Sequence, residues 1–214
     1  MSSTTFPYST AIKPTAALIT ALLVSGCGSI IPHKGPLHIE PAKHVTVGYH
    51  QTEKASIFES EEIKISVSPI NAADGDTGFP IINDLLTKDY VVFEMEIENG
   101  SGERVIYNPN HTSLMSNVMD YNKPLDYTDL FDIVMHGDDW IAAQKELREL
   151  KGRFYDLNTK LEPRRGVSKF ILFRPIDKSA TQVVLVIKEL YFGTKTISVD
   201  FIFKVRGEGD DDAK

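Results

Sequence analysis

The sequence has little cysteine and no apolar run long enough to span a membrane. Cys27 is the only cysteine among 214 residues. A single cysteine excludes an intramolecular disulfide, a cysteine-rich zinc site and a CxxCH haem attachment. The apolar run at residues 16–24 has nine residues, one of them threonine, whereas a membrane-spanning helix needs about 20. The lone cysteine, which follows this run and two small residues, therefore needs another explanation.

Positive charge is also scarce. The chain has 23 lysines and arginines against 30 aspartates and glutamates, which gives a net charge of −7. Removing residues 1–26 would take away Lys13 and no acid, so the remainder would carry −8. Binding of nucleic acids and polybasic attraction to anionic lipids both depend on lysine and arginine. We therefore predict no nucleic-acid partner. The 42% hydrophobic and 25% charged residues are typical of a globular domain.

Residues 1–26 have the order of regions typical of a secretory signal peptide. A polar stretch with Lys13 comes first, the apolar run at residues 16–24 follows, and the small residues Ser25 and Gly26 come last. This order matches the n-region, h-region and cleavage site of exported proteins. We predict that a signal peptidase removes residues 1–26 by cutting between Gly26 and Cys27.

The stretch LVSGC at residues 23–27 resembles the lipobox of bacterial lipoproteins. The resemblance implies that Ser25 and Gly26 supply the small side chains needed near the scissile bond. It also implies that the thiol of Cys27 becomes linked to diacylglycerol. Val24 departs from the pattern, because the family more often has leucine there. A lipid with two or more acyl chains holds a protein stably on a membrane, where one chain does not.

The lipoprotein resemblance also bears on localisation. In that family an aspartate after the lipidated cysteine favours the inner membrane, and here the residue is Gly28. The resemblance therefore implies a lipid-anchored protein of the bacterial cell envelope, with the outer membrane favoured over the inner membrane.

Residues 27–43 are predicted to form the lipidated Cys27 followed by an extended tether. They contain three prolines and little periodicity, and proline fixes φ and removes a backbone donor. Four of the six histidines lie in or near this segment: His33, His38, His44 and His50. Their spacing is irregular and does not match a metal-binding motif. We predict no metal site here.

From about residue 44 the apolar residues alternate with polar ones, which is typical of half-buried strands. The alternating segments are residues 45–49, 63–68, 91–98, 103–107, 167–174, 182–192 and 195–205. Gly193 and Thr194 separate the last two segments, as in a hairpin. We predict a mainly β fold over residues 44–206, an immunoglobulin-like antiparallel β-sandwich of about seven strands. Residues 207–214 are predicted to be an acidic disordered tail.

Residues 90–109 carry a second resemblance. An alternating strand is followed by Asn99 with small polar turn residues and then by a short strand before Pro109. This arrangement is similar to the central hairpin of immunoglobulin-like domains in exported bacterial lipoproteins of unassigned function. The resemblance implies a fold and a location, and it brings no functional residues with it.

A helical insertion is predicted over residues 127–161. A short helix would end at Gly137, and a longer one would start after Asp138 or Asp139. Apolar residues then recur every seven positions, with others between them, as in an amphipathic stripe: Trp140, Ala143, Leu147, Leu150, Phe154, Leu157 and Leu161. We expect this stripe to pack on the sandwich. The alternative is that part of it contacts a protein partner.

No set of residues indicates catalysis or a cofactor. Residues 71–78 have the oxygen-rich look of a calcium loop, but Ala73 and Ile82 occupy positions where an EF-hand loop needs ligands. Glu94, Glu96 and Glu98 lie on one face of a strand and are predicted to be solvated. We therefore predict a non-enzymatic, lipid-anchored envelope protein that serves as a protein–protein interaction or scaffold module. The alternative is a lipoprotein that binds a small ligand or a metal in a pocket between the insertion and the sandwich.

Overall fold

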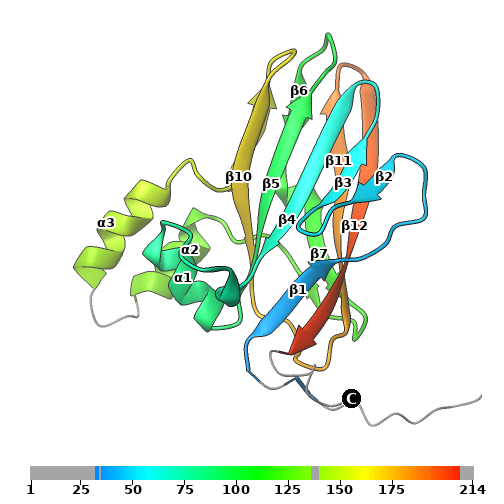
Figure 1. Ribbon diagram of the computed structural model, residues 1–214. Helices are drawn as coiled ribbons and strands as arrows, with labels where there is room; N and C mark the ends of the chain where they lie inside the picture. The colour runs from blue at the N-terminus through cyan, green and yellow to red at the C-terminus, as the bar shows by residue number, and fades with distance from the viewer. Residues whose placement is uncertain (1–31, 34, 136–139, 208–214) are drawn as a thin grey trace, which may run out of the picture. The chain divides into compact units, whose positions relative to one another are not determined.

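The computed structural model describes residues 32–207 apart from residues 34 and 136–139 (Figure 1). The predicted signal peptide, the cleavage site at Gly26 and Cys27, and the tail beyond Gly207 lie outside the described residues. The strands are β1 (Leu37–Pro41), β2 (Tyr49–Gln51), β3 (Ser56–Glu59), β4 (Ile63–Ile70), β5 (Val91–Asn99), β6 (Val105–Tyr107), β7 (Thr112–Ser116), β8 (Tyr121–Asn122), β9 (Thr159–Leu161), β10 (Gly166–Phe173), β11 (Gln182–Phe192) and β12 (Lys195–Gly207). The helices are α1 (Pro80–Thr87), α2 (Tyr127–Met135) and α3 (Trp140–Leu150), with short 3-10 helices η1 (Ala72–Asp74) and η2 (Pro109–His111).

Twelve strands in the described part form two antiparallel sheets, so the protein is mainly β as predicted. One sheet has the order β10-β5-β4-β3-β2. The other has the order β1-β12-β11-β6-β9, with β7 beside β11 and β8 beside β7. The predicted number of about seven strands is wrong, because several strands span only two to five residues. Segments this short contain too few alternations to stand out in a sequence.

The two sheets pack face to face around one core, which makes the fold a β-sandwich (Figure 1). Every second residue of β5 and β12 points into this core, and Phe93 of β5 contacts Phe203 of β12 with ring centroids 4.8 Å apart. The hairpin predicted at Gly193 and Thr194 is confirmed, since β11 and β12 pair across it. The alternation in the sequence therefore follows from burial on the inner face.

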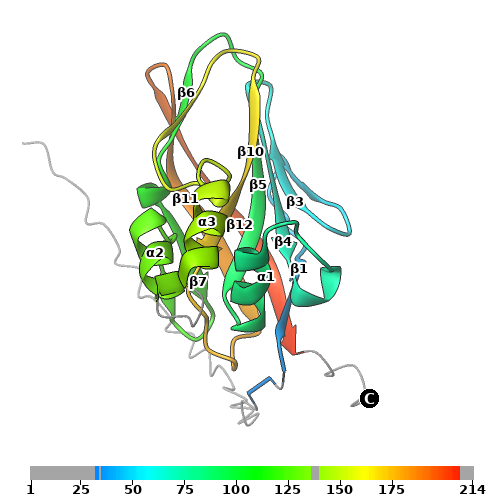
Figure 2. The same ribbon diagram turned by 90° about the vertical axis from the view of Figure 1, so that its left-hand side faces the viewer.

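A second, smaller core lies on the outer face of the β10-β5-β4 part of the sheet. Figure 2 shows the three helices side by side over one half of this sheet. Val92 of β5 and Leu172 of β10 are buried beneath the helices, whereas Glu94, one step further along the same face, is exposed. The outer face thus changes from apolar to acidic where the helical layer ends.

The predicted long helix is wrong in its extent. Helix α3 ends at Leu150, and Gly152 follows with φ +82°, a left-handed conformation that favours glycine and is common after helices. Phe154 lies beyond the helix in an extended segment, where Tyr155 N donates to Phe170 O at 2.8 Å. Leu161 belongs to β9. The heptad spacing in the sequence therefore joins residues that the structure places on three different elements.

Burial of the apolar stripe on the protein's own sandwich is confirmed for its central residues. Leu147, Leu150 and Phe154 are all fully buried in the second core. Leu157 is 73% exposed, so it does not belong to the stripe. The side chain of Trp140 and residues 137–139 lie outside the described part.

The predicted tether is wrong for residues 37–41, which form strand β1. This strand pairs with the end of β12, with Ile39 opposite Val205. Ile39 is buried, and the side chain of Asn71 accepts a hydrogen bond from Ile39 N at 2.7 Å and donates to Ile39 O at 3.1 Å. Pro41 is tolerated because β1 is an edge strand. None of the helices among the described residues is long and apolar enough to cross a membrane.

Candidate functional site

A groove of about 430 Å³ lies among the three helices. All three helices contribute to its walls, and its lining residues are Pro80, Ile81, Asp84, Leu85, Lys88, Ile133, Val134, Ala142, Ala143 and Glu146. The first five come from or directly follow α1, the next two from α2, and the last three from α3. The groove therefore depends on segments that are up to 66 positions apart in the sequence.

Local sequence explains why the groove stays open. Pro80 occupies the first turn of α1, a position where proline is tolerated because its missing N–H would have no partner there. Ile81 and Leu85 of α1 are buried and form the apolar floor. On the opposite side α3 presents Ala142 and Ala143, whose small side chains leave space between the helices.

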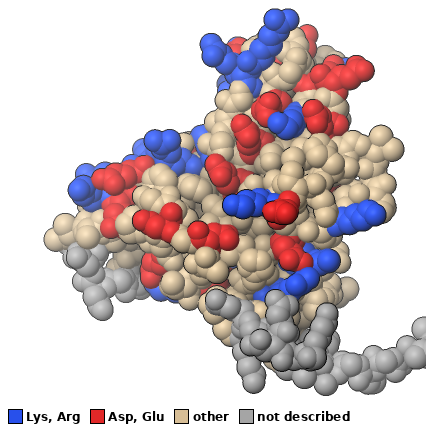
Figure 3. Space-filling view, in the orientation of Figure 1, with Lys and Arg blue, Asp and Glu red and all other residues tan. Residues whose placement is uncertain are grey.

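The charges around the groove include both signs. Lys88 Nζ lies 2.7 Å from Asp84 Oδ2 across one turn, and Glu146 of α3 lies among the same lining residues. Figure 3 shows acidic and basic side chains interspersed over the helices. Because Asp84 and Lys88 neutralise each other, the groove offers an apolar surface with a mixed polar rim. This arrangement suits binding of an apolar segment.

The three glutamates of β5 are spread along the exposed outer face of the sheet. Glu94 Oε1 accepts a hydrogen bond from Ser168 Oγ at 2.8 Å, and Glu98 pairs with Lys64 Nζ at 2.6 Å. Hydrogen bonding to Glu98 and its negative charge raise the pKa of Lys64 above its ordinary value. These contacts use the carboxylates for cross-strand pairing, as the solvated interpretation predicted.

The loop at residues 71–78 uses its polar side chains for internal hydrogen bonds. Asn71 holds β1, as described above. Asp76 accepts hydrogen bonds from Gly78 N at 2.9 Å and from Asn83 Nδ2 at 2.6 Å. These two donors hold the pKa of Asp76 below its ordinary value. The bond from Asn83 thus connects this loop, which contains η1, to α1.

Three of the four clustered histidines contact different partners. His33 Nε2 lies 3.0 Å from Ala180 O, and the ring of His44 stacks on Tyr49 with centroids 3.9 Å apart. His50 Nε2 lies 3.9 Å from Glu59 Oε2, and His38 lies within β1. Within the part that the structure describes, no three histidine, cysteine, aspartate or glutamate side chains are placed to hold a metal ion.

Two buried tyrosines have raised pKa values, but their hydroxyl groups are hydrogen-bonded within the core. Burial raises the pKa of Tyr107 and of Tyr155 well above the ordinary value. Tyr107 Oη lies 2.8 Å from Thr112 Oγ1, and Tyr155 Oη donates to Met95 O at 3.1 Å. The two rings meet edge to face inside the sandwich. Their hydroxyls are satisfied in the core, so these tyrosines hold strands together.

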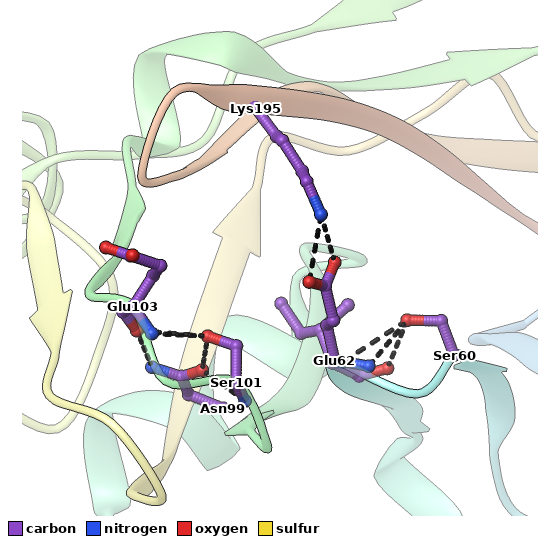
Figure 4. Close-up of polar contacts among 7 residues, drawn as sticks. Ser60, Glu62, Asn99, Ser101, Glu103 and Lys195 are labelled. Atoms are coloured by element: carbon purple, nitrogen blue, oxygen red, sulfur yellow. Dashed lines mark hydrogen bonds and ion pairs between the residues drawn. The ribbon is translucent and has the colours of Figure 1, made fainter.

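Asn99 is the last residue of β5, which ends at the side of the sandwich opposite the start of β1 (Figure 1). Its side chain forms a cluster of hydrogen bonds there (Figure 4). It is 2% exposed, and its amide Nδ2 donates to the carbonyls of Glu103, Glu162 and Leu161 at 2.8, 3.1 and 3.3 Å. Its Oδ1 accepts from Ser101 N and Ser101 Oγ. The sequence indicated only a turn at this position. The run Asn-Gly-Ser-Gly gave no signal that Asn99 joins two distant loops.

A second contact at this end joins the two sheets. Lys195 Nζ of β12 lies 2.9 Å from Glu62 Oε1, just before β4 (Figure 4). The pair is partly exposed, so its contribution to stability is small. The Lys195–Glu62 pair and the hydrogen bonds of Asn99 therefore connect the loops and sheets at this end of the sandwich.

Comparisons with known proteins add no function. No protein-family model matches the chain, and no curated protein matches it. Among solved structures, the yjhA protein from Bacillus subtilis is similar at 15% identity, over 61% of this chain and 76% of that one, with a TM-score of 0.35. A functionally unknown protein from Listeria monocytogenes EGD-e is similar at 12% identity, over 80% and 89%, with a TM-score of 0.34. Both TM-scores are below 0.5, so neither likeness supports an assignment.

Proposed function

We propose that the protein is a non-enzymatic lipoprotein of the bacterial cell envelope whose helical layer binds a segment of another protein. The anchor is the lipid on Cys27, supported by the signal-peptide pattern and by the lipobox-like residues 23–27. Gly28 favours the outer membrane. The domain is immunoglobulin-like, which the two face-to-face antiparallel sheets support.

The observation that carries the binding proposal is the groove among α1, α2 and α3. Its floor is apolar and its rim has both charges, which is the surface that an amphipathic helix or a short apolar segment contacts in helix-in-groove recognition. Ile141, at the start of α3, is 65% exposed beside the lining residues Ala142 and Ala143. An exposed isoleucine next to an apolar groove extends the surface available to a partner.

Filling the groove tests this proposal. Ala143→Gln should place a longer side chain in the groove without emptying the core beneath it. We expect its free energy of unfolding to stay within about 0.5 kcal/mol of the wild type, as for most surface changes. We expect loss of the proteins that crosslink to the wild type in detergent-solubilised membranes. Mass spectrometry of the crosslinked pull-down measures this loss.

Lys145→Gln is the matched control, because Lys145 lies two residues away with 78% of its side chain exposed. It should melt and capture partners like the wild type. Equal capture by the wild type, Ala143→Gln and Lys145→Gln would rule out the groove as the binding surface.

The volume of the groove supports a second candidate. Small-ligand pockets span about 300–1,000 Å³, and this groove has about 430 Å³. A bound small molecule would appear in native mass spectra of the wild type and Lys145→Gln but not of Ala143→Gln. That result without any crosslinked protein would favour a ligand-binding lipoprotein.

A further inference from the structure

The chain joins the sandwich at a defined point before β1. His33 N donates to Lys178 O at 2.8 Å, and His33 Nε2 lies 3.0 Å from Ala180 O. Lys178 Nζ in turn donates to Gly35 O at 3.2 Å. These contacts hold His33 and Gly35 against the loop between β10 and β11. The chain is therefore already attached to the folded domain at His33, well before the predicted end of the tether at residue 43.

This point of attachment limits how far the domain can lie from a lipidated Cys27. Six residue steps separate Cys27 from His33, and a fully extended chain covers at most about 3.6 Å per step, or about 22 Å in total. Strand β11 runs from this end of the sandwich to the other over 11 residues, a distance of about 35 Å. The β10–β11 loop lies at the same end of the sandwich as the start of β1 (Figure 1). A lipid on Cys27 would therefore keep this end within about 22 Å of the lipidated residue.

The turn between β7 and β8 lies at this same end and presents an apolar side chain. Asn117 Oδ1 accepts hydrogen bonds from Thr181 N at 2.9 Å and from Gln182 N at 3.1 Å. Asp120 Oδ2 accepts from Asp177 N at 2.7 Å. These bonds join the turn to the loop that holds His33. Met119, between Asn117 and Asp120, is 95% exposed.

Neither the backbone nor the core explains a methionine at position 119. Its φ is +70°, a left-handed conformation in which glycine, asparagine or aspartate is more usual. The turn is fixed by Ser116 Oγ, which accepts from Asp120 N at 3.1 Å. The apolar side chain of Met119 is therefore exposed on a hydrogen-bonded turn, next to the loop that His33 contacts.

We propose that Met119 contacts the interfacial layer of the phospholipid bilayer that holds the lipid of Cys27. This inference rests on the proposed lipid anchor. Charge does not drive the contact, because Lys178 pairs with Asp89 at 2.8 Å and the nearby Asp120 and Asp177 are acidic. The turn thus orients the sandwich, with the Asn99 end directed away from the membrane.

A fluorescence experiment on the lipidated protein that begins at Cys27 tests the contact. In the variant Met119→Cys the new thiol is the only free one, because lipid occupies Cys27. Its matched control is Arg164→Cys, since Arg164 is also exposed, has φ +58° and lies at the Asn99 end, where Asn99 N donates to Arg165 O at 2.8 Å. Each thiol is labelled with an environment-sensitive dye, and the protein is reconstituted into phosphatidylcholine vesicles that contain spin-labelled phospholipid.

We expect the spin-labelled lipid to quench the dye at position 119 several-fold more than the dye at position 164. Co-sedimentation with the vesicles is measured on the same samples. Co-sedimentation with equal quenching at both positions would overturn the contact and leave the anchor intact. Failure of both proteins to co-sediment would overturn the anchor and, with it, this inference.

Discussion

Replacing Phe154 with alanine will lower the free energy of unfolding by about 3–5 kcal/mol, the usual cost of emptying a buried aromatic site. Phe154 is fully buried in the second core. Its backbone neighbours bind β10, with Phe170 N donating to Arg153 O at 2.9 Å. The variant therefore leaves a cavity between the helices and the sheet. Urea unfolding of the purified protein, followed by circular dichroism, measures the loss.

Leu157→Ala provides the control for this prediction. Leu157 lies three residues further along the same segment but is 73% exposed. We expect its free energy of unfolding to stay within about 0.5 kcal/mol of the wild type. If Phe154→Ala and Leu157→Ala unfolded at the same urea concentration, the helical layer would not be packed on the sheet as described.

Asn99→Ala should cost about 3 kcal/mol of unfolding free energy, because each buried polar group left without a partner costs about 1–3 kcal/mol. The substitution removes the donor for three carbonyls and the acceptor for Ser101. Asn99→Asp keeps the shape but replaces the Nδ2 donor with an oxygen that faces those carbonyls. We expect it to destabilise the protein at pH 7 at least as much as alanine does. The same urea titration measures both.

Asn110→Ala is a matched control, since Asn110 is exposed in the short η2 helix. It should unfold within about 0.5 kcal/mol of the wild type. A stability of Asn99→Asp close to that of the wild type would show that the amide donor is not what closes this end of the sandwich.

The sequence predicted the long strands and missed most of the short ones for a physical reason. The strand expected at residues 45–49 is wrong, because Val45 and Val47 are exposed and only Tyr49 belongs to a strand. Strands β5 and β12 have nine and 13 residues, enough for the alternation of a half-buried strand to repeat several times. Strand β1 has only five residues, ends in Pro41 and directly follows Pro36. Its position depends on pairing with β12 and on hydrogen bonds to Asn71. These contacts join residues far apart in the sequence, so the alternation of neighbouring residues does not predict them.

The helical layer was predicted in part. The burial of Leu147 and Leu150 follows from their spacing on one helix, but the placement of Phe154 depends on the stop at Gly152. Helix α1 was not predicted, because its eight residues are too few for the apolar spacing of a helix to repeat clearly, and residues 80–87 were assigned to no element. The candidate groove needs α1 beside α2 and α3, so its existence could not be inferred without the tertiary arrangement.

The lipid at Cys27 is the basis of the proposed membrane anchor, and one mass measurement tests it. The protein extracted from membranes should begin at Cys27 and carry the added mass of a diacylglyceryl group, while Cys27→Ser should carry no lipid. Mass spectrometry of the intact protein and of its N-terminal peptide distinguishes these forms. A membrane-extracted protein that retains residues 1–26, or that begins elsewhere with an unmodified Cys27, would contradict the account.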